Sequence, residues 1–227
     1  RSPNRTNTLF YCTDGWFYPD GGSGYITNYT TIAMTIRNVP DGKAFGLGKI
    51  KTVGDTEIVV DWGDGTVTNL TSYDSTILEN SFTHQYHNDT ASDYTIHIYG
   101  KVKEINAFTG SSFLVAGSLD TDHHMTGIED NIYLTDFSVG NAVGLEKINA
   151  NSFLNCSNLS LICSYADGSP PDPALPTSLT YIGQSAFAGC SSLASLNWMP
   201  SSVSTIGRQC FAGCTSLSSI SGMSDTY

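Results

Sequence analysis

The residues whose types and spacing point most directly to chemistry are Asp61 and Asp64, two carboxylates on either side of Gly63. Paired carboxylates beside a glycine-rich turn suit Ca²⁺, which takes several oxygen ligands. The pair lacks the D-x-D-x-D-G spacing of a calcium loop, however, and turn aspartates also accept hydrogen bonds from backbone amides. We therefore expect a turn-forming role for both residues, with a calcium site as the alternative.

Histidines are the next residues with metal-binding or acid–base chemistry. His123 and His124 lie among aspartates, but adjacent residues on a strand point to opposite faces, so both could ligate one ion only from a loop. We expect a solvated loop tip there. His97 alternates with apolar residues and is predicted to be exposed, whereas His84 is expected to make structural hydrogen bonds.

Catalytic motifs are missing from the sequence. It contains no G-x-S-x-G elbow, no H-E-x-x-H motif and no phosphate-binding glycine loop. Its many serines recur at equivalent spacer positions and have no partnered base. We therefore predict that the chain is not an enzyme and needs no cofactor, the calcium alternative aside.

The charge balance excludes further classes of partner. The 227 residues include 21 acidic and 10 basic ones, which gives a net charge of −11. Nucleic-acid binding depends on Lys and Arg that neutralise phosphates, and anionic membranes attract basic segments. No apolar run is long enough to span a bilayer. We predict no nucleic-acid partner and no membrane insertion within this segment.

The first half of the chain has the patterns of β-strands. Residues 32–37 and 94–99 alternate apolar and polar side chains, and residues 56–62 are β-branched and end at a glycine-rich turn. Short strands with no helical period between them predict a small antiparallel sandwich over residues 31–103. The preceding residues 1–30 are expected to form an irregular aromatic-rich arm or the first strands.

One motif inside this region resembles a known module. Val-Asp-Trp-Gly-Asp-Gly-Thr at 60–66 is followed by His-Gln-Tyr at 84–86 and by Tyr-Thr-Ile at 94–96. The combination resembles the PKD-like β-sandwich module, whose W/F-G-D-G-T turn precedes an H-x-Y and a Y-T-V strand. We expect the glycines to permit the tight turn and the aromatic side chains to fill the sandwich. The structural positions of this motif are Trp62, Gly63, Gly65, His84 and Tyr86.

Three later stretches share one spacing, at residues 145–162, 179–196 and 203–220. An aliphatic pair is followed five residues later by Phe, then at intervals of three by Cys, Leu and a further aliphatic residue. Such recurrence indicates a solenoid, in which each unit buries its apolar face against the next. A proline-rich insert at 166–176 accounts for the longer first interval. The recurring residues are Phe153, Phe187 and Phe211, with Cys156, Cys190 and Cys214.

The six cysteines do not form a recognisable disulfide framework. Three of them occupy the equivalent repeat position just described, and Cys210 replaces a small residue of the other units, so all four are predicted to fill small buried slots. Cys12 and Cys163 have no assigned role. The absence of C-x-x-C gives a zinc or redox motif no support.

The repeats resemble the leucine-rich repeats of BspA-like surface proteins. Residues 199–220 fit that family's P-x-S-V-x-x-I-G-x-x-A-F-x-x-C-x-x-L-x-x-I pattern, with Cys210 at the usual Ala. The resemblance implies a mainly β chain, an antiparallel PKD/Ig-like β-sandwich followed by a leucine-rich repeat solenoid. Residues 104–144 are then degraded first repeats and residues 145–227 clear ones. No polar cap follows the last repeat, so we expect a longer parent polypeptide.

Solenoids present long regular surfaces that suit recognition, and binding anchors are often aromatic. The aromatic residues next to the repeat strands are Trp198, Tyr165 and Tyr181, although each also suits packing against a neighbouring unit. The BspA-like resemblance implies a non-enzymatic extracellular or cell-surface protein. Its expected function is adhesion, through recognition of a protein or glycan partner.

Two other functions stay open. The chain suits a structural subunit or decoration of an extracellular filament, sheath or phage appendage, which self-association through the repeat end or a sheet edge would favour. It also suits a carbohydrate-binding accessory module of a larger enzyme, because aromatic faces stack on sugar rings. The aromatic residues of the arm that support this last function are Phe10, Tyr11, Trp16, Phe17 and Tyr18.

Overall fold

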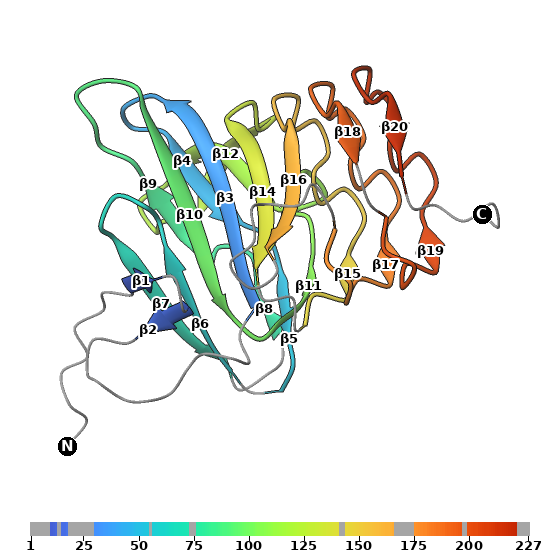
Figure 1. The fold of residues 1–227 in the computed structure, drawn as a ribbon. Coiled ribbons are helices and arrows are strands. Elements are labelled where there is room, and N and C mark those ends of the chain that lie inside the picture. Colours follow the sequence, from blue (N-terminus) through green and yellow to red (C-terminus); the bar gives the residue numbers. More distant parts are fainter. Residues whose placement is uncertain are drawn as a thin grey trace.

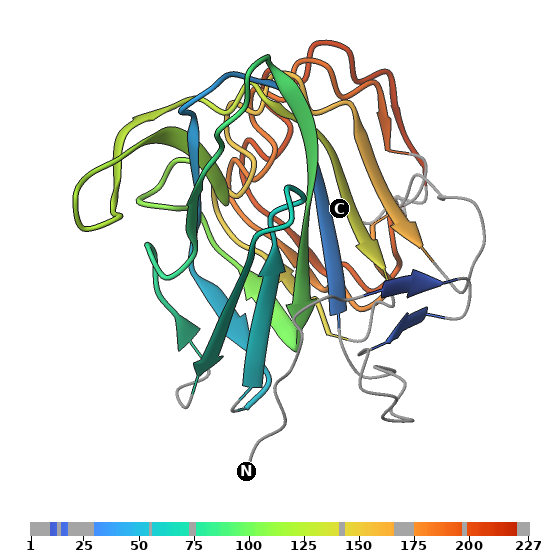
Figure 2. The same ribbon diagram turned by 90° about the vertical axis from the view of Figure 1, so that its left-hand side faces the viewer.

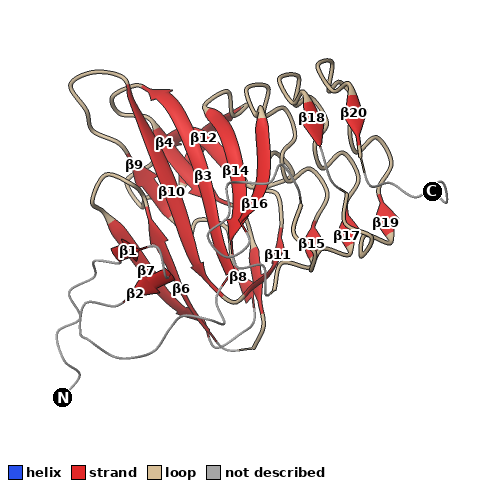
Figure 3. Ribbon diagram, viewed as in Figure 1, coloured by secondary structure: helices blue, strands red, loops and turns tan. Residues whose placement is uncertain are grey.

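The chain is built from β-strands. Every regular element of the described residues is a strand, and none is a helix (Figure 3). The prediction of a mainly β chain is confirmed. The computed structural model describes residues 10–12, 15–17, 30–54, 56–72, 76–140, 144–165, 175–196 and 199–221.

Sheet I has six strands, with β3 and β10 at its centre (Figure 1). Ile32 and Met34 of β3 lie opposite Ile98 and Ile96 of β10, so the alternating sequence of both strands places its apolar residues on one face. The strands predicted at residues 32–37, 56–62 and 94–99 are confirmed in β3, β6 and β10, with β6 ending at residue 61. The order of sheet I is β16 (Leu161–Tyr165), β14 (Leu134–Gly140), β3 (Thr30–Val39), β10 (Ser92–Gly100), β6 (Thr56–Asp61) and β7 (Val67–Ser72).

Two further sheets face sheet I across the core (Figure 2). Sheet II has the order β19 (Thr205–Ile206), β17 (Tyr181–Ile182), β15 (Lys147–Ile148), β11 (Val102–Ile105), β5 (Ile50–Thr52) and β8 (Thr76–Ile77). Sheet III has the order β13 (Met125–Glu129), β12 (Leu114–Leu119), β4 (Ala44–Leu47) and β9 (Thr83–Gln85). Two-stranded pairs are formed by β1 (Phe10–Cys12) with β2 (Gly15–Phe17) and by β18 (Ser195–Leu196) with β20 (Ser219–Ile220).

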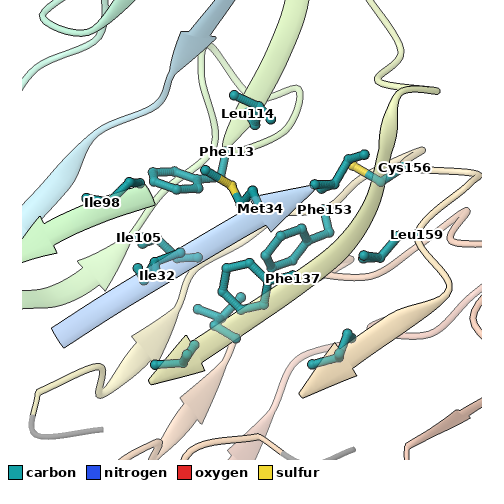
Figure 4. Packing of buried hydrophobic residues seen from close by; sticks show 14 of the residues in the cluster. Ile32, Met34, Ile98, Ile105, Phe113, Leu114, Phe137, Phe153, Cys156 and Leu159 are labelled. Carbon is teal, nitrogen blue, oxygen red and sulfur yellow. The ribbon is translucent and has the colours of Figure 1, made fainter. Parts of the chain in front are cut away.

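The larger of two hydrophobic clusters among the described residues runs between the sheets and on into the repeats (Figure 4). Ile32 and Met34 enter it from sheet I, Ile105 from sheet II and Leu114 from sheet III, and Phe153 enters it from the first clear repeat. All are at most 1% exposed. The antiparallel part and the repeats therefore share one core.

Sheets I and II both pass from antiparallel to parallel pairing without a break. In sheet I, β14 pairs antiparallel with β3 and parallel with β16. In sheet II, β11 pairs antiparallel with β5 and parallel with β15. The predicted boundary between residues 103 and 104 lies inside β11.

The three clear repeats, here repeat 1 (residues 145–162), repeat 2 (179–196) and repeat 3 (203–220), stack their phenylalanines. The rings of Phe153 and Phe187 are parallel within 7° and have centroids 5.0 Å apart. Phe187 and Phe211 are parallel within 5° at 5.6 Å. Offset stacking of this kind adds to the gain from burying the rings, so the phenylalanines form a spine through the repeats.

Two of the recurring cysteines form hydrogen bonds with the phenylalanines of this spine. The thiol of Cys190 donates to the carbonyl oxygen of Phe153 at 3.1 Å, and that of Cys214 donates to Phe187 at 3.1 Å. Burial raises the pKa of the Cys156 thiol to about 12. The predicted buried slot is confirmed for Cys156 and Cys190, whereas Cys214 is half-buried. The free cysteines among the described side chains are Cys156, Cys163, Cys190, Cys210 and Cys214.

Burial declines along the repeats. Phe187 and Leu193 of repeat 2 are 0% exposed, whereas Phe211, Leu217 and Ile220 of repeat 3 are only half-buried. Repeat 2 is covered on both sides, by repeat 1 and by repeat 3. Within the described residues, repeat 3 is covered only by repeat 2.

Candidate functional site

The parallel strands of sheet II carry a row of outward side chains. Ile105, Ile148 and Ile182 lie in register and are buried at 0%, so the residue before each of them points away from the core. The same alternation places Lys51 of β5 beside Glu104. This outward row runs across sheet II in the order Thr76, Lys51, Glu104, Lys147, Tyr181 and Thr205.

Electrostatic pairing organises the middle of the outward row. The Glu104 carboxylate lies 3.6 Å from the Lys51 ammonium and 3.4 Å from that of Lys147, and it accepts a hydrogen bond from Asn149 Nδ2 at 3.2 Å. Burial alone would raise the pKa of Glu104, but the hydrogen bonds from Asn149 and Lys147 and the two positive charges outweigh it and lower that pKa. The side chains of Lys51 and Lys147 are 48% and 41% exposed and that of Glu104 only 11%, so the surface presents mainly ammonium groups.

Of the three predicted aromatic anchors, Tyr181 belongs to the outward row and is half-buried next to Lys147. Tyr165 ends β16 opposite Gly140, and its side chain lies outside the described residues. Trp198 lies wholly outside them. The side chains of the N-terminal arm are likewise outside the described residues. A binding role for the three anchors stays a prediction.

The W-G-D-G-T turn packs around the buried Trp62. The His84 ring stacks on the indole with centroids 5.1 Å apart, and the Tyr86 hydroxyl donates to the Trp62 carbonyl oxygen at 2.7 Å. Gly63 has a φ of 82°, and a Cβ there would lie 2.5 Å from the carbonyl oxygen of Thr95. Only glycine fits a position with that backbone conformation and so close a neighbour.

Both aspartates of the turn are engaged by nearby donors. Asp61 Oδ1 accepts the Gly63 amide at 2.9 Å, Asp64 Oδ1 accepts the Thr66 amide at 2.9 Å, and Asp64 Oδ2 lies 2.7 Å from His84 Nε2. Burial would raise the pKa of Asp64, but the hydrogen bonds from Thr66 and His84 outweigh it and lower that pKa. Among the described residues, no group of three or more His, Cys, Asp or Glu is placed to hold a metal ion. The calcium alternative stays a prediction.

The remaining histidines divide between a loop and a strand. His123 and His124 are exposed in the turn before β13, and Asp120 Oδ1 accepts the His124 amide at 2.8 Å, as expected of a solvated loop tip. The prediction that His97 is exposed is wrong. His97 is half-buried on the outward face of sheet I, its ring stacks with that of Tyr99 at 5.9 Å, and burial lowers its pKa.

Comparison with protein families finds one match, over residues 164–226, to a family described as BspA type leucine rich repeat region (6 copies). The match supports a BspA-like leucine-rich repeat region in this segment. It contains repeats 2 and 3, and BspA-type repeats are a non-enzymatic, binding type of family. No curated protein and no solved structure matches the chain. In the described part of the chain, no helix is long and apolar enough to cross a bilayer.

Sequence reasoning identified Tyr181 but missed the charged residues beside it. Lys51 and Glu104 belong to strands that are distant in sequence, and only the pairing of β5 with β11 brings them together. The sequence does offer a partial signal for the two lysines. Lys51 and Lys147 each lie next to an isoleucine in a short strand-like pattern, which indicates that they point outward. The register of the sheet decides which charged residues become neighbours. The spacing of the BspA-type repeats does not predict that register.

Proposed function

We propose that the chain is a non-enzymatic binding protein, secreted or displayed on a cell surface, that attaches to a protein or glycan partner through the outward face of sheet II. Proteins with BspA-type repeats are typically surface-displayed or secreted, which supports this location. The sequence contains no catalytic motif, and the matched family is of binding type. Adhesion is the function that these features support best.

The proposal extends to the architecture. We take the stacked repeats to be a leucine-rich repeat solenoid that continues a PKD-like sandwich. Support comes from the equivalent amide bonds between successive units, in which Gly183 donates to Ile148 and Gly207 donates to Ile182, both at 2.8 Å. The packing of His84 and Tyr86 around Trp62 supports the PKD-like part.

The observation that carries the proposal is the outward row itself. It begins in the antiparallel part with Lys51, crosses Glu104 and Lys147, and continues to Tyr181 on the repeats. A row of exposed cationic side chains with a half-buried aromatic one offers the kinds of anchor that binding surfaces use.

A steric block in the row tests the proposal. The immobilised chain is screened against a panel of matrix proteins and a glycan array, first as the wild type and then as Thr205→Glu. The matched control is Thr71→Glu, a change to another exposed strand residue, on β7 of sheet I. We expect loss of binding in Thr205→Glu alone. Absence of any bound partner, or equal binding by the two variants, would contradict the proposed surface.

The structural-subunit alternative stays open, and it is tested at repeat 3, where Phe211, Leu217 and Ile220 are half-buried. Burying them against a second copy of the chain would give the hydrophobic gain that repeat 2 already has. Mass photometry over a dilution series separates the two functions. A concentration-dependent assembly that Leu217→Lys abolishes supports the subunit function, and a monomer at all concentrations rejects it.

A further inference from the structure

We propose that the outward row of sheet II binds a polyanionic glycan, a sugar chain that carries carboxylate or sulfate groups. The inference rests on the proposed function and specifies its partner. Three features of the described residues support it: the local sign of the charge, the spacing of the cations across the strands, and the aromatic residue next to them.

Basic residues are concentrated on three adjacent strands of sheet II. The whole chain carries a net charge of −11, yet five of its ten basic residues lie on or directly before β5, β11 and β15. Three glutamates lie within 4.0 Å of four of these lysines, which leaves an excess of two positive charges among the described side chains of this area. The lysines are Lys49, Lys51, Lys101, Lys103 and Lys147, and the glutamates are Glu79, Glu104 and Glu146.

This area is therefore a cationic island on an acidic protein. The acidic remainder of the chain repels a polyanion at long range. An anionic partner would therefore be directed to the island. Within the outward row, the exposed groups are the side chains of Lys51 and Lys147, because Glu104 between them is 11% exposed. Glu146 is 41% exposed but lies against Lys103, outside the row. A ligand that lies along the row itself therefore meets Lys51 and Lys147.

The spacing of the row suits an extended polymer that crosses the strands. Lys51 and Lys147 flank Glu104 on neighbouring strands, so their backbones are about 10 Å apart, twice the strand spacing. Tyr181 follows one strand further on and Thr205 after it. A polymer lying across β5, β11, β15, β17 and β19 would thus meet two cations, an aromatic ring and a hydroxyl in turn.

The aromatic ring favours a glycan over an acidic polypeptide. The face of Tyr181 can stack against the apolar face of a sugar ring, and the Thr205 hydroxyl can bond sugar hydroxyls. An acidic polypeptide would use the lysines without needing the ring. The contribution of Tyr181 therefore distinguishes the two classes of ligand.

The test measures binding of defined polymers to the intact chain by isothermal titration calorimetry. Polygalacturonate supplies carboxylates, dextran sulfate supplies sulfates, and unmodified dextran and polyglutamate are the comparison polymers. We expect binding of at least one charged glycan, none of dextran, and weakening with added salt, because exposed ion pairs are screened. Binding of polygalacturonate alone or of dextran sulfate alone identifies which anionic group is recognised.

Two kinds of variant, which remove positive or negative charge from the row, are expected to change the affinity in opposite directions. The double variant Lys51→Ala/Lys147→Ala is expected to weaken binding about tenfold, as loss of two exposed ion pairs implies. Glu104→Gln removes the negative charge between them and is expected to tighten binding. The matched control is Lys43→Ala, directly before β4 of sheet III. The Lys43 ammonium pairs with Glu129 at 2.8 Å, so its loss should leave binding unchanged.

Tyr181 decides the class of ligand. Tyr181→Ala should weaken glycan binding and Tyr181→Phe should preserve it, with melting temperatures confirming that both variants fold. Three results would each overturn the inference: no charged glycan binds, Lys43→Ala weakens binding as much as the double variant, or polyglutamate binds as well as the glycans and Tyr181→Ala changes nothing. If Thr205→Glu nevertheless abolishes attachment to another partner, the inference fails while the proposed function stands.

Discussion

Phe187 occupies the centre of the phenylalanine spine, and its truncation tests the stacking of the repeats. The side chain is 0% exposed and lies between Phe153 at 5.0 Å and Phe211 at 5.6 Å. Replacing a fully buried Phe with Ala typically lowers the free energy of unfolding by about 3–5 kcal/mol. For Phe187→Ala we expect about 4 kcal/mol, because the ring has a neighbour on each face and the cavity cannot collapse from either side.

Phe211→Ala is the matched control. Phe211 holds the same repeat position but is half-buried and stacks on one phenylalanine ring among the described residues. We expect a loss of about 2 kcal/mol, half that at Phe187, since about half of the contact is absent. The comparison removes effects of residue type and local backbone and leaves burial as the variable.

Equilibrium unfolding in urea, followed by far-ultraviolet circular dichroism, measures both losses. With a slope of about 2–3 kcal/mol/M, Phe187→Ala should lower the urea midpoint by about 1.5 M and Phe211→Ala by about half as much. Equal losses in the two variants would refute the reasoning, and so would a loss below about 1 kcal/mol at Phe187, because neither fits a ring that is covered on both faces in repeat 2 and on one face in repeat 3.

Three further predictions concern the repeats and the turn. Cys190→Ala should lower the free energy of unfolding in urea by about 1–2 kcal/mol, because it removes the thiol that donates to the Phe153 carbonyl oxygen. An unchanged urea midpoint would show that this hydrogen bond does not stabilise the fold. Gly183→Ala should lower the melting temperature, because the added Cβ would lie 2.3 Å from the Ala150 nitrogen; an unaltered temperature would mean that the repeats separate easily. The pKa of Asp64 is lowered in the folded chain, so its stabilising contribution is present above the ordinary value of 3.8 and is lost as the pH falls through the lower folded value. Urea midpoints from pH 5 to pH 2 should therefore fall more steeply in the wild type than in Asp64→Asn, and parallel curves would disprove the coupling.

The repeat positions were predictable where their spacing is regular. Phe153, Phe187 and Phe211 follow an aliphatic pair by the same interval, and the structure stacks them. Phe113 was not predictable in this way. It lies eight residues after Ile105 instead of five, so the spacing does not identify it.

Backbone bonding nevertheless places Phe113 at the repeat position. Its amide donates to the Ser152 carbonyl at 2.7 Å, just as the Phe153 amide donates to Ala186 at 2.7 Å. The β12–β13 hairpin is then inserted before β14, which supplies the second strand of this earlier unit. The extra residues interrupt the sequence period, so the hydrogen bonds, and not the spacing, assign Phe113 to the repeat position.

The candidate site was predictable only in part, for a different reason. An aromatic residue beside a repeat strand is visible in the sequence, as Tyr181 is. The charges of Lys51 and Glu104 become neighbours through the register of β5 on β11, which includes a shift between Val102 and Glu104. Such a bulge changes which side chains share a face, and the local sequence pattern does not predict it.

The unbroken passage of sheets I and II into the repeats has a mechanical consequence. A tethered attachment protein bears load, and a flexible linker between modules would stretch before the modules did. Here β3 with β14 and β5 with β11 join the two parts by backbone hydrogen bonds over a shared core. A pull on the repeats is therefore transmitted directly to the antiparallel strands, and under load the outward row, the proposed binding surface, keeps its orientation.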